Sequence, residues 1–313
     1  MAREGLYAAR RYASIAPAAP HALHMPSHIY ARLGLWPDDI RSNLSSKAAS
    51  EEKAGMHVGA EARLHAMEFL EYAYLQIGHA DEAQRIVIEA ATVKQSDVTP
   101  MFAGYYPIVE ARFPSLFAIE TQDWTTAGRL EPVAGAGRFS QGLTLLAHAV
   151  AAGHRHDARA GKAAAQAIDA LLAKAPRLPP DLGVTGLGDE IHAWSDFSQG
   201  DLRGAVALLR PIADRQASLG KEEVELPARE MLAEILLLGG SNAEALHEYQ
   251  LSLLSDPGRF NALLGAGRSA EQLGQRALAV RYYRMLLANC EGASGAAVKL
   301  LEHARTVVNE TRG

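Results

Sequence analysis

The sequence predicts an all-α protein, an antiparallel solenoid of helical hairpins, from its composition and from a repeated spacing of small residues. Of its 313 residues, 48% are hydrophobic but only 6% are aromatic, which is typical of packed helices rather than sheets. Glycine is expected to end the first helix of a hairpin in a left-handed conformation, and an alanine five positions later lets the second helix pack closely. This spacing occurs at Gly78/Ala83, Gly153/Ala158, Gly200/Ala205, Gly240/Ala245 and Gly274/Ala279.

The last two repeats follow the spacing most closely. Gly240 and Gly274 lie 34 positions apart. Tyr249 and Tyr283 follow them by nine positions each, and Pro257 stands where its repeat should end. This pattern of small residues, tyrosine and proline resembles the tetratricopeptide repeat family.

The resemblance covers roughly residues 5–310 and implies a superhelix of about seven hairpins, whose first helices line a concave groove. The run His24-Met25-Pro26-Ser27-His28 also resembles a bacterial subgroup of this family, whose members have further repeats upstream. Residues 4–15 resemble the second helix of a hairpin that has lost its first helix. We therefore expect that the chain is truncated at its N-terminus.

Proline and glycine concentrate in residues 176–188, which we expect to form a linker. This linker would separate hairpins in residues 1–175, which contain the histidines, from repeats in residues 189–313, which end in a capping helix. The spacing is weakest between residues 100 and 175, where Gln122 stands at the position of a turn glycine.

The first helix suggests self-association. Leu6, Ala9 and Tyr12 form an apolar face for which the sequence offers no hairpin partner. Exposed apolar faces of this kind often meet a symmetry-related copy. The sequence therefore predicts a homodimer formed through residues 5–16.

Composition excludes several classes of protein. The net charge of −5 and the scattered Lys and Arg give no footprint for nucleic acid. Cys290 is the only cysteine, which excludes an internal disulfide and a cysteine-rich zinc site. No apolar stretch is long enough to span a membrane, and the N-terminus has no apolar signal core. A soluble, cytoplasmic protein is expected.

Histidines gather at groove positions of the first two hairpins. If Gly34 and Gly78 occupy the turn position 15 of the family's repeat, the inward positions 2, 5 and 9 hold His21, His24 and His28 in one hairpin and His65, Glu68 and Tyr72 in the next. Imidazoles with a carboxylate are common zinc ligands. We expect one divalent metal ion, most readily zinc, bound by two or three of His21, His24 and His28 together with His65 and, as a further candidate, Glu68. If the helix begins only at Pro26, His21 and His24 would lie on its entry loop.

Later groove positions suggest a ligand site. Arg112 takes position 5 of the third hairpin, where it suits an anionic group. An acidic groove with an aromatic floor could accept a basic or amphipathic peptide, or a small ligand. Its expected residues are Tyr72, Glu190, Trp194, Phe197, Glu230, Glu234, Arg268 and Glu271. The segment His154-Arg155-His156-Asp157 is expected to be a solvated turn.

Three functions remain open. The resemblance implies a scaffold that binds a peptide or small ligand in its groove. The alternative is a metal-dependent hydrolase of esters or phosphoesters, with Glu68 as ligand or general base. The third is a fragment without activity of its own. Neither a phosphate-binding loop nor a nucleophile elbow occurs in the sequence.

Overall fold

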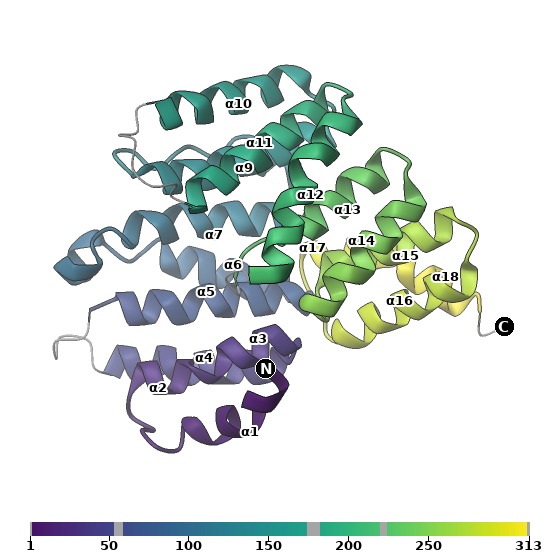
Figure 1. The fold of residues 1–313 in the computed structure, drawn as a ribbon. Coiled ribbons are helices and arrows are strands. Elements are labelled where there is room, and N and C mark those ends of the chain that lie inside the picture. The colour runs from purple at the N-terminus through teal and green to yellow at the C-terminus, as the bar shows by residue number, and fades with distance from the viewer. Residues whose placement is uncertain (1, 53–58, 174–181, 220–223, 312–313) are drawn as a thin grey trace.

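The computed structural model describes residues 2–52, 59–173, 182–219 and 224–311 (Figure 1). Within these ranges helices dominate and no strand is formed; one isolated bridge joins His79 and Ser294. The predicted all-α solenoid of antiparallel helical hairpins is confirmed.

The helices follow one another as hairpins. An N-terminal helix α1 (Ala2–Tyr12) precedes them, and two short 3-10 turns, η1 (Gln95–Asp97) and η2 (Pro100–Phe102), lie before α7. The paired helices are α2 (Pro20–His24) and α3 (Pro26–Leu33) with α4 (Trp36–Glu52), α5 (Glu61–Gln76) with α6 (Ala80–Ala90), α7 (Tyr106–Glu120) with α8 (Trp124–Ala127), α9 (Arg138–His154) with α10 (Ala158–Ala173), α11 (Leu182–Ser198) with α12 (Leu202–Leu219), α13 (Ala228–Leu238) with α14 (Asn242–Ser255), and α15 (Phe260–Gln272) with α16 (Arg276–Asn289). Helices α17 (Ala296–Leu300) and α18 (Glu302–Asn309) end the array.

Glycines make the turns of most hairpins. The glycines that have a left-handed φ at these turns are Gly34 (65°), Gly78 (70°), Gly200 (88°), Gly240 (79°) and Gly274 (69°). The alanines expected to permit close packing are fully buried, namely Ala83, Ala205, Ala245 and Ala279. The repeat spacing therefore predicted both the turns and the contacts between paired helices.

Two hairpins turn without glycine. Gln122 adopts a φ of 57° at the predicted turn position. The predicted pair Gly153/Ala158 is wrong, because Gly153 lies inside α9 and His156 makes the left-handed turn, with a φ of 49°. The small residue five positions later is Gly161, on which a Cβ would lie 2.2 Å from Ser198 Oγ. The turn is thus displaced by three residues, while the spacing of turn and small residue is kept.

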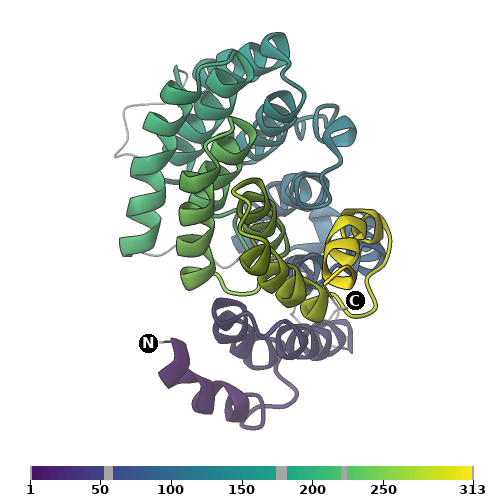
Figure 2. The ribbon, with the colours of Figure 1, turned by 90° about the vertical axis from the view of Figure 1, so that its right-hand side faces the viewer.

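The solenoid curls so that its last hairpins meet its first ones. Helix α15 packs against α5, and α17 packs against α6. Figure 2 shows the yellow C-terminal helices beside blue helices from the first third of the chain. The indole of Trp36 donates a hydrogen bond to Gly258 O at 3.1 Å, and Ser294 N donates to Gly78 O at 2.9 Å. These bonds fix the relative positions of the two ends of the array.

One apolar core crosses the segment that was expected to be a linker. A continuous cluster of buried side chains extends from Ala118 on α7 to Val308 on α18. Of the expected linker 176–188, residues 176–181 lie outside the described residues, and the rest belongs to α11, which begins at Leu182. Helices α10 and α11, which precede and follow this segment in the sequence, pack against each other.

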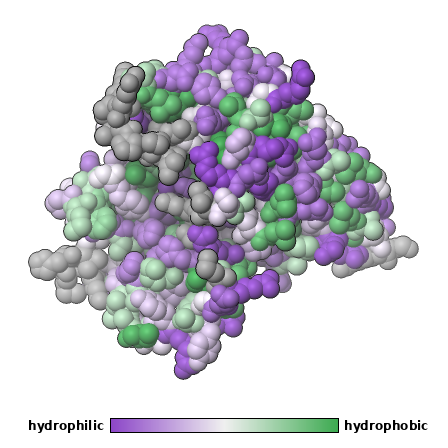
Figure 3. All heavy atoms as spheres, in the orientation of Figure 1, coloured by the Kyte–Doolittle hydropathy of each residue, from purple (hydrophilic) through white to green (hydrophobic). Residues whose placement is uncertain are grey.

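Helix α1 packs on α3 and leaves large side chains exposed. Ala9 is buried, and a Cβ on Gly5 would lie 3.2 Å from Ile29 Cδ1. Tyr7 on α1 is 70% exposed, and Ile15 in the turn after it is 78% exposed. On the face in Figure 3, hydrophilic residues are interspersed with hydrophobic patches. No helix among the described residues is long and apolar enough to cross a membrane.

Candidate metal centre

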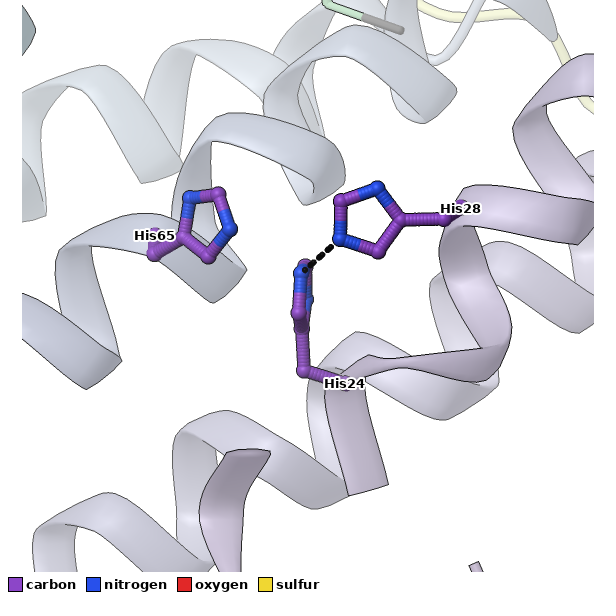
Figure 4. A group of neighbouring side chains, drawn as sticks. All are labelled: His24, His28 and His65. Atoms are coloured by element: carbon purple, nitrogen blue, oxygen red, sulfur yellow. Dashed lines mark hydrogen bonds between the residues drawn. The ribbon is translucent and has the colours of Figure 1, made fainter. Parts of the chain in front are cut away.

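Three histidines from two neighbouring hairpins point toward one another (Figure 4). His24 ends α2, His28 lies on α3 and His65 lies on α5. One ring nitrogen of each can be chosen so that all three nitrogens lie within 4.8 Å of one another, and the Nε2 atoms of His24 and His28 are 3.0 Å apart. Pro26 interrupts the helix between these two residues, but Met25 keeps a helical φ of −50° and ψ of −34°, so both side chains remain near one face.

A chain of hydrogen bonds fixes the tautomer of His24. Asn43 Nδ2 donates to Asp39 Oδ1 at 2.6 Å, which leaves Asn43 Oδ1 to accept from His24 Nδ1 at 2.7 Å. His24 Nε2 therefore carries a lone pair directed at His28. Burial, followed by the charge of His65, lowers the pKa of His24 to about 3. The imidazole is neutral at physiological pH, as a metal ligand must be.

Glu68 fixes His65 in a similar way. Its Oε2 accepts from His65 Nδ1 at 3.2 Å and from the Tyr105 hydroxyl, and its Oε1 accepts from Arg112 Nη1 at 2.6 Å. Burial would raise the pKa of Glu68, but Arg112, His65 and Tyr105 outweigh it and the pKa is lowered. Glu68 is thus an ionised acceptor that leaves His65 Nε2 available for a metal.

The size of the group suits a zinc ion. Nitrogens at the usual zinc distance, about 2.0–2.1 Å in tetrahedral geometry, lie roughly 3.3 Å from one another. The 3.0 Å contact and the 4.8 Å limit bracket this spacing. The buried ring of Phe69 packs against all three imidazoles, with centroid distances of 4.7, 4.9 and 5.5 Å. This apolar wall excludes water on one side, while His65 is 38% exposed on the other.

The structure assigns different places to two residues expected in this site. His21 is exposed and lies outside the group of three, its ring centroid 6.4 Å from that of His24. Glu68 lies behind His65 with both carboxylate oxygens engaged, so it orients the His65 ring and does not belong to the group of three. Asn43 and Tyr105, which sequence reasoning did not single out, complete the supporting shell.

Two predicted groove residues belong to a buried ion network instead. Arg259 donates from Nε and Nη2 to Glu230 at 2.6 and 2.9 Å, and from Nη2 to Glu120 at 2.5 Å. Its Nη1 donates to the hydroxyl of Tyr72. Tyr72 and Glu230 therefore hold α5, α7, α13 and α15 together. Arg259 is fully buried and was missed from sequence, because its partners lie far away in the chain.

Two more of the predicted groove residues, Trp194 and Glu234, lie beside His154. The His154 ring stacks between Trp124 and Trp194, with centroid distances of 3.8 and 5.4 Å. Of the turn expected at residues 154–157, Arg155 and His156 are exposed as predicted, but His154 ends α9 with its side chain only 9% exposed, and burial lowers its pKa to about 3. Its Nε2 lies 3.5 Å from Glu234 Oε1. The charge of Arg268 acts on both groups, but burial still raises the pKa of Glu234 to about 7.

Arg112 and Glu190 line a separate cavity of about 350 Å³. It lies between α7, α9, α11 and α12, and residues 224–226 also line it. Since Arg112 also holds Glu68, the cavity adjoins the supporting shell of the histidine group. The predicted ligand residues thus fall into several places: Arg112 and Glu190 share this cavity, Trp194, Glu230 and Glu234 border a smaller one, and neither includes Tyr72 or Arg268.

Comparison of the sequence with models of protein families gives no match, and neither does a search of curated proteins.

Proposed function

We propose that the protein is a helical-repeat scaffold that binds one divalent transition metal ion, zinc foremost, through His24, His28 and His65. The convergence of three imidazole nitrogens within 4.8 Å of one another carries this proposal. Two of the imidazoles already donate Nδ1–H to an oxygen acceptor, as metal-bound histidines usually do. Nitrogen ligands favour zinc and its neighbours over magnesium and calcium, which prefer oxygen.

The hairpin geometry supports membership of the tetratricopeptide repeat family as part of this proposal. Left-handed glycines and fully buried alanines recur at the family's offsets, as at Gly240/Ala245 and Gly274/Ala279. The metal would then lie where first helices line the concave face, the usual place for a bound peptide or small ligand. The proposal also includes the cytoplasmic location that the sequence predicts.

Zinc titration of untagged protein tests the metal site. After removal of metal with a chelator, the wild type should bind one zinc ion per chain in competition with a chromophoric chelator. His28→Ala and His65→Ala should lose this binding with helix content unchanged. His21→Ala is the matched control, because His21 lies on α2 but outside the group, and it should bind like the wild type. Equal binding by all four proteins would refute the site.

Hydrolysis is the second candidate, favoured by the number of ligands. A tetrahedral zinc ion held by three protein nitrogens has a fourth position open for water. Zinc lowers the pKa of a water bound there to near 7. The His65 side chain is 38% exposed, so this side of the group is accessible from solvent. Both oxygens of Glu68 are engaged, so the geometry does not favour Glu68 as the general base. Zinc-dependent hydrolysis of a nitrophenyl ester or phosphodiester, lost in His28→Ala, would support this candidate, and zinc binding without turnover would leave only the scaffold.

A further inference from the structure

The cavity beside α7 has mostly apolar walls. Ile119, Phe139, Leu146 and Ile212 contribute to them from three helices. A volume of about 350 Å³ is at the lower end of the range for small-molecule sites, roughly 300–1,000 Å³. Apolar walls of this kind provide affinity for the body of a ligand, and the few polar groups among them determine which ligand fits.

Two polar side chains in this cavity have no partner within the described part of the chain. Ser115 is 4% exposed, and its hydroxyl makes no hydrogen bond. Glu190 is 6% exposed, and no hydrogen bond or ion pair joins its carboxyl to a described residue. A buried polar group without a partner is destabilising, so its presence on a cavity wall indicates a role in binding.

The charges around Glu190 select the sign of the ligand. Burial first, then the nearby carboxylates of Glu225 and Asp189, raise the pKa of Glu190 to about 8. Neither of the arginines on the cavity wall is among the groups that act on it. Arg112 is held by Glu68, and Arg215 is exposed on α12. Among the described residues, the groups that act on the Glu190 carboxyl are therefore its apolar surroundings and two carboxylates, without a cation.

We propose that this cavity binds a small apolar amine, whose ammonium group pairs with the Glu190 carboxylate. The aliphatic or aromatic body of the amine would lie against the apolar walls, and the Ser115 hydroxyl offers a further hydrogen-bonding group in the same space. Pairing with the ammonium supplies Glu190 with a cation, which no described residue provides to it. This proposal does not depend on the metal site, because it rests on different residues and can be tested in chelator.

Calorimetric titration with three compounds of equal chain length tests the charge of the ligand. Octylamine should bind the wild-type protein in the presence of a chelator, 1-octanol should bind at least tenfold more weakly, and octanoate should not bind. Glu190→Gln keeps the shape of the side chain and should weaken octylamine binding at least tenfold. Glu302→Gln on α18 is the matched control and should leave it unchanged.

A cavity-filling variant tests the location. Leu143 lines the cavity, so Leu143→Phe should abolish octylamine binding while thermal unfolding shows that the protein remains folded. The proposal would be overturned by tighter binding of octanoate, by equal binding of octylamine to Glu190→Gln, or by the absence of saturable binding for butylamine, hexylamine and octylamine alike.

Discussion

Arg259 and Glu120 form a fully buried ion pair, with 2.5 Å between Nη2 and Oε1, although they lie 139 positions apart in the sequence. Glu230 shares the same guanidinium. Arg259→Met would leave two buried carboxylates without their cation. We expect the free energy of unfolding to fall by about 3–5 kcal/mol, measured by urea denaturation followed by circular dichroism.

Two further variants separate the ion network from general damage. Arg281 is exposed on α16, and Arg281→Met should change stability by no more than about 0.5 kcal/mol. Adding Glu120→Gln and Glu230→Gln to Arg259→Met should recover much of the lost stability, since the buried negative charges are then removed. If Arg259→Met is as stable as Arg281→Met, the network contributes nothing.

The supporting shell of the histidine group should determine zinc affinity. Asn43→Ala removes the acceptor that holds His24 Nδ1, and Glu68→Gln weakens the acceptor of His65 Nδ1. Each should raise the zinc dissociation constant about 10–100-fold, measured by chelator competition. Ser45→Ala, on the exposed side of α4, should have no effect. Unchanged affinity in Asn43→Ala would mean that its hydrogen bond does not orient a ligand.

Glu190 should make the protein less stable as pH rises. Its pKa is about 8 in the folded state against 4.5 as the ordinary value, so between these pH values the unfolded chain releases a proton that the folded chain keeps. Stability is then lost progressively from pH 4.5 to 8, on the order of a few kcal/mol. Glu190→Gln should match the wild type near pH 4 and exceed it at pH 8 in urea denaturation. A difference that does not vary with pH would contradict this assignment.

The exposed side chains of the N-terminal segment should mediate the homodimer expected through residues 5–16. Tyr7 and Ile15 remain exposed although Ala9 packs on α3. Light scattering at tens of micromolar should give the mass of a dimer for the wild type and of a monomer for Tyr7→Glu/Ile15→Glu. Met101→Glu changes another exposed apolar residue and should leave the dimer intact. A monomeric wild type would end this prediction.

Repeat spacing predicted the fold because turn glycines and small residues act locally. It also placed His24, His28 and His65 on the inner helices. It did not predict which histidines meet, since His65 at position 2 contacts positions 5 and 9 of the preceding hairpin, and this offset depends on how one hairpin is rotated on the next. Asn43 lies on an outer helix and Tyr105 on a loop, where the repeat pattern gives no signal. The contacts of Arg259 could not be predicted from the repeat pattern either, because its partners come from other hairpins.

The return of α15 and α17 onto α5 and α6 has a consequence for how this protein can change. An open array tolerates the gain or loss of a hairpin, because each unit meets only its neighbours. Here an inserted hairpin would separate Gly258 from Trp36 and Ser294 from Gly78, breaking bonds at both ends at once. The number of hairpins is therefore constrained like the number of strands in a closed barrel, and sequence variation should be tolerated in side chains more readily than in repeat count.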